Sequence, residues 1–225
     1  MLGEDVLIGA ENSRIKTLDL PELAEMGHYC LCNARALTEL NVPALTAMGA
    51  WCLQNIDSLT MFNAPALTTM GDYCLHNVNV LTSFSANALT TMDEMCLQNA
   101  PALTTFNANA LTTMGDWCLY EAKGLTSFTA NALTTMGENC LFDIDALTTF
   151  NANALTTMGD FCLRNAPVLT TFNTPSLTTM GDYCLRNAPV LTQLNAPLLK
   201  TTLPDHLKRF ASISSSQPPK RKLRR

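Results

Sequence analysis

The chain has 225 residues, of which 47% are apolar and 15% charged. That is enough apolar material to bury a continuous core, which excludes a wholly disordered chain. The formal net charge of −5 is unevenly divided, because residues 1–199 hold six basic and 18 acidic side chains (−12) and residues 200–225 hold eight and one (+7). The acidic body disfavours nucleic acid as a partner of residues 1–199.

Residues 1–22 are predicted to form an N-terminal cap. Residues 15–21, Ile-Lys-Thr-Leu-Asp-Leu-Pro, match the later Leu-Thr-Thr-Phe-Asn-Ala-Pro, so this segment is a degraded repeat of the kind found at the ends of repeat arrays. The first acids, Glu4 and Asp5, precede any basic residue, so no secretory signal is predicted and the protein is expected to be intracellular, cytoplasmic or nuclear. A cell-surface or secreted location is the alternative if the gene carries an upstream export signal.

Residues 23–198 are eight units of 22 residues with no insertion or deletion. The period is marked by Cys30, Cys52, Cys74, Cys96, Cys118, Cys140, Cys162 and Cys184. A fixed period of this length predicts a solenoid, in which each unit buries its apolar side against its neighbours. No uncharged apolar run approaches the roughly 18 residues of a membrane span, so none is predicted.

The unit LTTMGDYCLRNAPVLTTFNAPA resembles the BspA-like (Treponema-type) leucine-rich repeat, which reads roughly L-T-S-I-G-x-x-A-F-x-x-C-x-x-L-x-x-I-x-I-P. Met replaces Ile, Cys-Leu replaces Ala-Phe and Asn replaces the later Cys. The resemblance implies a leucine-rich-repeat-like solenoid with one parallel β-sheet, built from the Thr-Phe-Asn-Ala segments, and short helical or extended turns opposite. It also implies adhesion at a cell surface, the role for which family members are known.

The cysteine column is predicted to consist of buried thiols, because it occupies the Ala position of the resembled repeat beside an apolar Leu. Disulfides between coils and a metal site are the alternatives, although the sequence has no Cys-x-x-Cys pair, and no cofactor or metal is expected. The sixth position is acidic in six successive units: Asp72, Glu94, Asp116, Glu138, Asp160 and Asp182. We expect these carboxylates to cap a single helical turn, and the alternative is a strip for cations or a basic partner.

Asparagine recurs at two positions. At the eleventh it is expected to bond the backbone of the next coil. At the nineteenth it alternates with inward Phe on the predicted strand, so Asn107 and Asn151 should point outward on a polar face and are candidate binding residues. Adjacent threonines such as Thr68 and Thr69 recur in later units, which raises ice or mineral binding as a remote alternative to simple surface solubility.

A second candidate site lies in the middle of the array. The seventh and tenth positions vary between otherwise similar units and carry aromatic residues, a composition common in binding hot spots. Tyr120, Lys123, Asn139 and Phe142 lie where the units depart most from the consensus, so they are predicted to form a binding patch. The alternative is that the aromatic rings only shield the edge of the core.

Residues 199–213 are predicted to form a C-terminal capping helix, with Pro204 in its first turn and Leu207, Phe210 and Ile213 on its apolar side. Residues 214–225 read as a disordered basic tail. Its cationic residues, Lys220, Arg221, Lys222, Arg224 and Arg225, are typical of a nuclear-localisation signal, which makes an import receptor a possible partner. Contact with a polyanion and a solubilising end without a specific role are the alternatives.

No catalytic constellation is apparent, since the histidines His28, His76 and His206 share no column and have no repeated nucleophile partner. The sequence therefore predicts a non-enzymatic protein-interaction scaffold, a leucine-rich-repeat binding module with an effector-like, nuclear-targeted character, whose partner is another protein. An adhesin-like surface binder is the main alternative.

Overall fold

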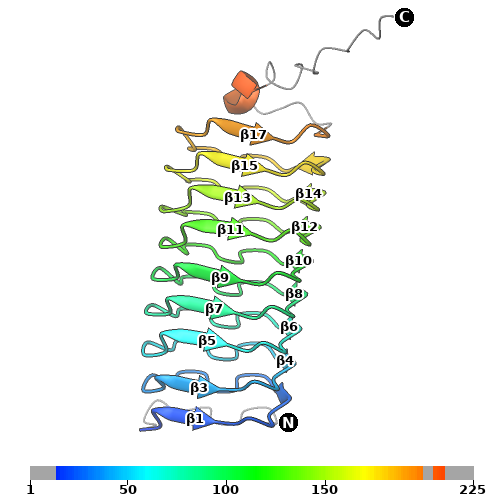
Figure 1. Cartoon of the computed structure of the whole chain (residues 1–225). Coiled ribbons are helices and arrows are strands. Elements are labelled where there is room, and N and C mark those ends of the chain that lie inside the picture. Colours follow the sequence, from blue (N-terminus) through cyan, green and yellow to red (C-terminus); the bar gives the residue numbers. More distant parts are fainter. Residues whose placement is uncertain (1–13, 200–204, 211–225) are drawn as a thin grey trace, which may run out of the picture.

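The computed structural model describes residues 14–199 and 205–210, and the polypeptide winds through them as a parallel β-solenoid (Figure 1). Each coil is one 22-residue unit, and successive coils stack in register from the N-terminal to the C-terminal end of the array. The predicted repeat solenoid is confirmed. The basic cluster 220–225 lies outside the described residues.

One side of every coil carries a three-residue strand. These strands are β1(Thr17–Asp19), β3(Glu39–Asn41), β5(Met61–Asn63), β7(Ser83–Ser85), β9(Thr105–Asn107), β11(Ser127–Thr129), β13(Thr149–Asn151), β15(Thr171–Asn173) and β17(Gln193–Asn195). They pair in parallel in three consecutive groups, β1-β3, β5-β7-β9 and β11-β13-β15-β17. The register places each residue opposite its equivalent one coil away, as in Phe128 opposite Phe150. These are the strands predicted from the Thr-Phe-Asn segments, and their outer surface is called the odd-strand face below.

A second parallel sheet, which the sequence did not predict, is formed by two-residue strands in the order β16-β14-β12-β10-β8-β6-β4-β2. Its strands are β2(Glu25–Met26), β4(Ala47–Met48), β6(Thr69–Met70), β8(Thr91–Met92), β10(Thr113–Met114), β12(Thr135–Met136), β14(Thr157–Met158) and β16(Thr179–Met180). Met points inward in each. The preceding Thr, from Thr46 to Thr178, donates its hydroxyl to the backbone carbonyl of the same position one coil earlier, at 2.8–3.1 Å.

The core is a set of ladders that run along the solenoid axis. The phenylalanine rings from Phe62 to Phe172 stack at centroid distances of 5.2–5.6 Å. The cysteines are buried, as predicted, and from Cys52 to Cys184 each thiol donates to the carbonyl of the fifth position of the preceding coil at 2.9–3.2 Å. Burial raises the pKa of the Cys96 and Cys140 thiols, so they are held protonated.

The turn between the two sheets is not helical, so the predicted helical turn is wrong. Residues at the seventh, ninth and eleventh positions adopt left-handed backbone angles, with φ between 53° and 66°. Their N–H groups bond to neighbouring coils instead of to their own turn. In one coil, Tyr73 donates to Glu94 and Asn77 to Gln98 of the next coil, whereas Leu75 donates to Cys52 of the preceding one. These bonds between coils replace the i→i−4 bonds of a helix.

A 3-10 helix, η2(Asp205–Phe210), lies at the end of the array (Figure 1). It falls within the 199–213 segment predicted to be a capping helix, and residues 200–204 and 211–213 lie outside the described part. Leu207 and Phe210 are buried against the core. His206 Nε2 lies 2.9 Å from the carbonyl oxygen of Cys184. In earlier coils the equivalent cysteine carbonyl accepts a hydrogen bond from the backbone N–H of a leucine in the next coil. None of the helices in the described residues is long and apolar enough to cross a membrane.

Candidate functional site

The odd-strand face carries the outward side chains of the seventeenth and nineteenth positions, because the Phe or Leu between them points into the core. Three depressions lie on this face, one near each end of the array and one in the middle. Their walls consist mainly of Thr, Ser and Asn side chains. This surface therefore combines hydrogen-bonding side chains with apolar area, is hollowed in three places, and runs along the solenoid.

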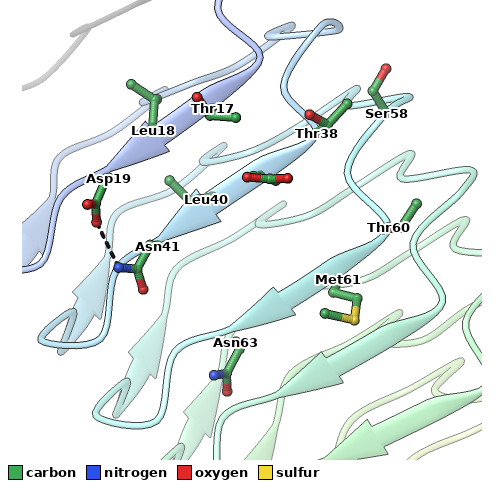
Figure 2. Close-up of a pocket in the computed structure, with 11 residues that line it drawn as sticks. Thr17, Leu18, Asp19, Thr38, Leu40, Asn41, Ser58, Thr60, Met61 and Asn63 are labelled. Atoms are coloured by element: carbon green, nitrogen blue, oxygen red, sulfur yellow. Dashed lines mark hydrogen bonds between the residues drawn. The ribbon is translucent and has the colours of Figure 1, made fainter.

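The largest depression, about 780 Å³, lies across β1, β3 and β5 near the N-terminal end (Figure 2). Asn41 Nδ2 donates to Asp19 Oδ1 at 2.7 Å along its floor. Glu39 lines it as a second carboxylate, and Met61 is 64% exposed there. Met61 is thus an exposed apolar side chain among hydrogen-bonding groups.

The two predicted asparagines lie on this face but in different depressions. Asn107 of β9 lines the middle depression with Thr105 and Asn109. Asn151 of β13 lines the C-terminal one with Asn173, whose Oδ1 accepts a hydrogen bond from Asn195 Nδ2 at 2.7 Å.

The other four predicted residues lie in the turn that joins the even strand of each coil to its odd strand. This part of the coil is called the turn side below. The rings of Tyr120 and Phe142 stack at 5.0 Å. Lys123 Nζ lies 3.6 Å from Glu121 Oε2. Burial, together with the nearby charges of Glu121 and Asp143, raises the pKa of the Tyr120 hydroxyl. The six predicted residues thus lie on two different sides of the solenoid, and the two asparagines line separate depressions.

The repeat also matches known proteins. A family profile described as BspA type leucine rich repeat region (6 copies) matches residues 10–120 and 104–209. The chain belongs to the BspA-type leucine-rich repeat family. No curated protein matches it in sequence.

Among solved structures, the solenoid is similar to a leucine-rich repeat protein of T. pallidum, with 11% identity and a TM-score of 0.61 over 91% of this chain and 86% of that one. It is also similar to a leucine-rich cell surface protein from Faecalibacterium prausnitzii, with 13% identity, a TM-score of 0.45 and coverage of 82% and 70%. The first of these likenesses shows the fold, which is a leucine-rich-repeat solenoid.

The asparagines at the eleventh position of this BspA-type array bond one another, not the backbone as expected. Asn55 Nδ2 donates to Asn33 Oδ1, and the series of bonds continues through Asn77 to Asn99 at 2.8–2.9 Å. It stops at Glu121, whose carboxylate has no N–H to donate. A second run begins at Asp143, which accepts from Asn165 Nδ2 at 2.5 Å.

The acidic column does not cap helical turns. Asp72, Asp116 and Asp160 instead accept the backbone N–H of the sixth position of the next coil at 2.7–3.0 Å. The donors belong to Glu94, Glu138 and Asp182. The acids were correctly expected to accept backbone N–H groups, but those groups lie one coil away.

Sequence reasoning missed the N-terminal depression. A signal was present, because Met61 is the one apolar residue among the outward seventeenth positions of the odd strands. Asp19 belongs to the degraded repeat, which the sequence assigns to the N-terminal cap, and by sequence Glu39 is only one member of the polar outward face. Within the described residues, no group of three or more His, Cys, Asp or Glu side chains could hold a metal ion.

Proposed function

We propose that this BspA-type protein is a non-enzymatic binding scaffold that holds a partner protein on the odd-strand face. The observation that carries the proposal is the shared location of the three depressions, the largest of which exposes Met61. The inward residues of the odd strands are almost uniform from coil to coil. The outward seventeenth position runs through Glu, Met, Ser, Thr and Gln, so the shape stays constant while the recognised surface changes.

A photo-crosslinking amino acid placed on each side of the solenoid tests this proposal. We expect crosslinks to a protein partner from positions 61, 105 and 149 on the odd strands. Matched positions 69, 113 and 157 on the even strands should give few. Met61→Asp should reduce the crosslinks at position 105 without changing the thermal midpoint. Equal crosslinking from the two sides would contradict the proposal.

Family membership supports a cell-surface, adhesin-like setting for this binding, because adhesion is the role known for the family. The intracellular, effector-like setting depends on a nuclear-targeting tail whose residues lie outside the described part. Cell fractionation separates the two settings. A reporter fused to residues 214–225 and found only in the cytosol would remove the nuclear one.

Ice or mineral binding stays a remote alternative. The threonines just before the even strands already use their hydroxyls to bond the preceding coil, which leaves one outward Thr hydroxyl on each two-residue strand from β6 to β16. Absence of thermal hysteresis in solution would dispose of ice binding.

A further inference from the structure

The sheet on the odd-strand face is interrupted at two places, between β3 and β5 and between β9 and β11. Where neighbouring odd strands pair, the Thr just before the strand donates its N–H and its hydroxyl to the carbonyl of the same position one coil earlier. Thr82 does so to the Thr60 carbonyl at 2.8 and 3.0 Å. Within residues 14–199, neither bond is made from Thr60 to Thr38 or from Thr126 to Thr104. The backbone groups on the two sides of each interruption therefore lack their usual partners.

Two of the three depressions on this face lie across these interruptions. Thr38 and Thr60 line the N-terminal depression at the first interruption (Figure 2), and Thr104 and Thr126 line the middle depression at the second. An extended polypeptide carries alternating backbone donors and acceptors, which are the groups that the Thr38 carbonyl and the Thr60 N–H and hydroxyl can bond. The backbone of a bound segment can therefore supply hydrogen bonds that the solenoid itself does not make here.

The two interruptions differ in charge. Asp19 and Glu39 are the only ionisable residues at the outward seventeenth and nineteenth positions from β1 to β17, and both line the N-terminal depression. Neither carboxylate forms an ion pair with a residue in the described part of the chain. The residues that line the middle depression are all uncharged. The N-terminal depression therefore attracts a cation, and the middle one does not.

Met61 adds an apolar contact near these carboxylates. Its side chain is 64% exposed, at a repeat position where most odd strands have Ser or Thr, and it lines the same depression as Asp19 and Glu39. Lys and Arg have long apolar stems that lie along apolar surface while the charged end reaches a polar group. A basic side chain can therefore contact both Met61 and a carboxylate, which an inorganic cation cannot.

We infer that the N-terminal depression binds an extended segment of a partner protein that contains lysine or arginine. The backbone of the segment bonds the unpaired groups of Thr38 and Thr60. A basic side chain packs its stem on Met61 and places its charge near Asp19 and Glu39. This inference rests on the function proposed for the odd-strand face and names the class of segment that its largest depression recognises.

Fluorescence anisotropy of labelled peptides with the full chain provides the test. The probe is a ten-residue peptide in which Thr alternates with Lys, so that an extended conformation places all Lys side chains on one side. A second peptide has the same sequence with alternate backbone nitrogens methylated, which removes N–H donors and keeps the charge. We expect the methylated peptide to bind at least about fivefold more weakly. Equal affinities would overturn the inference, because charge alone would then suffice, and so would the absence of binding by the first peptide.

Two double variants with the same change of charge locate the site. Asp19→Asn with Glu39→Gln should weaken binding of the unmethylated peptide at least about fivefold. An amide oxygen at position 19 can still accept the hydrogen bond from Asn41. Glu138→Gln with Asp182→Asn, on the turn side, is the control and should leave the affinity within about twofold. Equal weakening in the two variants would overturn the inference, since the net charge and not the depression would then attract the peptide. Thermal midpoints of both, measured alongside, establish that they fold.

Met61→Thr, which restores the residue common at this position, should weaken binding of the same peptide about threefold through loss of the apolar contact. Wild-type affinity in this variant would overturn the placement of the basic side chain.

The crosslinking experiment on the odd strands separates this inference from the proposed function. Protein crosslinks from positions 61, 105 and 149, combined with wild-type peptide affinity in the Asp19 and Glu39 double variant, would overturn the inference alone. Equal crosslinking from the two sides of the solenoid would remove the proposed function and this inference with it.

Discussion

The strand side and the turn side of this solenoid repeat with the same period but hold the polypeptide in different ways. On the strand side, β11 and β13 are ordinary parallel strands, and stacked phenylalanines fix their register. On the turn side, alternate residues are left-handed and bond in turn to the coil above and the coil below. The conformation of the strand side is thus fixed by buried side chains, whereas that of the turn side is fixed by hydrogen bonds between closely spaced backbones.

Truncating a stacked ring should produce the largest loss and test the strand side of the comparison. Phe128 is buried and stacks on Phe106 and Phe150, so Phe128→Ala should cost about 3–5 kcal/mol of unfolding free energy in urea denaturation. Phe128→Leu should cost distinctly less, because Leu40 and Leu194 fill the equivalent positions of other coils. Equal losses would contradict this expectation and would show that ring stacking, and not apolar volume, stabilises the strand side.

Adding a single methyl group tests the turn side. A Cβ at Gly159 would lie 2.7 Å from the backbone nitrogen of Glu138 and from the carbonyl carbon of Gly137. Neither is a flexible group, so Gly159→Ala should cost about 1–3 kcal/mol by forcing the coils apart. Thr157→Ala, on the outer surface of β14, is the control and should change the free energy of unfolding by less than about 0.5 kcal/mol.

The series of asparagine side-chain hydrogen bonds is interrupted at Glu121, and restoring it should stabilise the protein. Glu121→Asn would supply an amide to bond Asn99 Oδ1, and we expect about 0.5–1.5 kcal/mol of added stability in urea denaturation. Glu121→Gln removes the charge but is too long to continue the ladder. A similar gain in both variants would mean that relief of repulsion between Glu121 and Asp143, not the new bond, is responsible.

Glycine substitution should have different effects on the two sides. Thr149→Gly on β13 should lose about 0.5–1 kcal/mol, because glycine gives up more backbone freedom in a strand. Asn139→Gly should be neutral or slightly stabilising, since the residue already has a φ of 56°. Thermal unfolding of the two glycine variants measures this difference in stability. Equal losses of stability in both variants would contradict the prediction.

The smallest effect is expected from pH. Burial, followed by the charge of Asp72, raises the pKa of Asp93 above its ordinary value of 3.8. The folded protein thus binds this proton more tightly than the unfolded one, so the penalty is present at neutral pH and disappears below pH 3.8. Asp93→Asn should be more stable than the wild type at pH 7, with the difference shrinking towards about pH 3.5 in matched denaturant titrations. If the stability difference between Asp93→Asn and the wild type does not change with pH, the raised pKa of Asp93 is not its cause.

The sequence was sufficient for the parts of the structure that depend on alternation within one coil. The 22-residue period predicted the solenoid, and the Thr-Phe-Asn pattern predicted the odd strands with Asn107 and Asn151 facing outward. The turn was not predictable in the same way, because Leu75 and Tyr73 take left-handed angles that such residues rarely adopt on their own. Likewise, the bonding of Asp72 depends on a neighbour 22 residues away, which no local pattern reveals.

The bonding of the acidic column has a consequence for the length of the array. Asp72, Asp116 and Asp160 each reach the next coil, and a Glu, one methylene longer, follows each of the first two, whereas Asp182 follows Asp160. From Asp72 to Asp160, two coils, or 44 residues, are therefore the smallest unit that repeats both the shape and these bonds. Removing the single coil 89–110 would set Asp72 directly against Asp116, which is the arrangement that Asp160 and Asp182 already have.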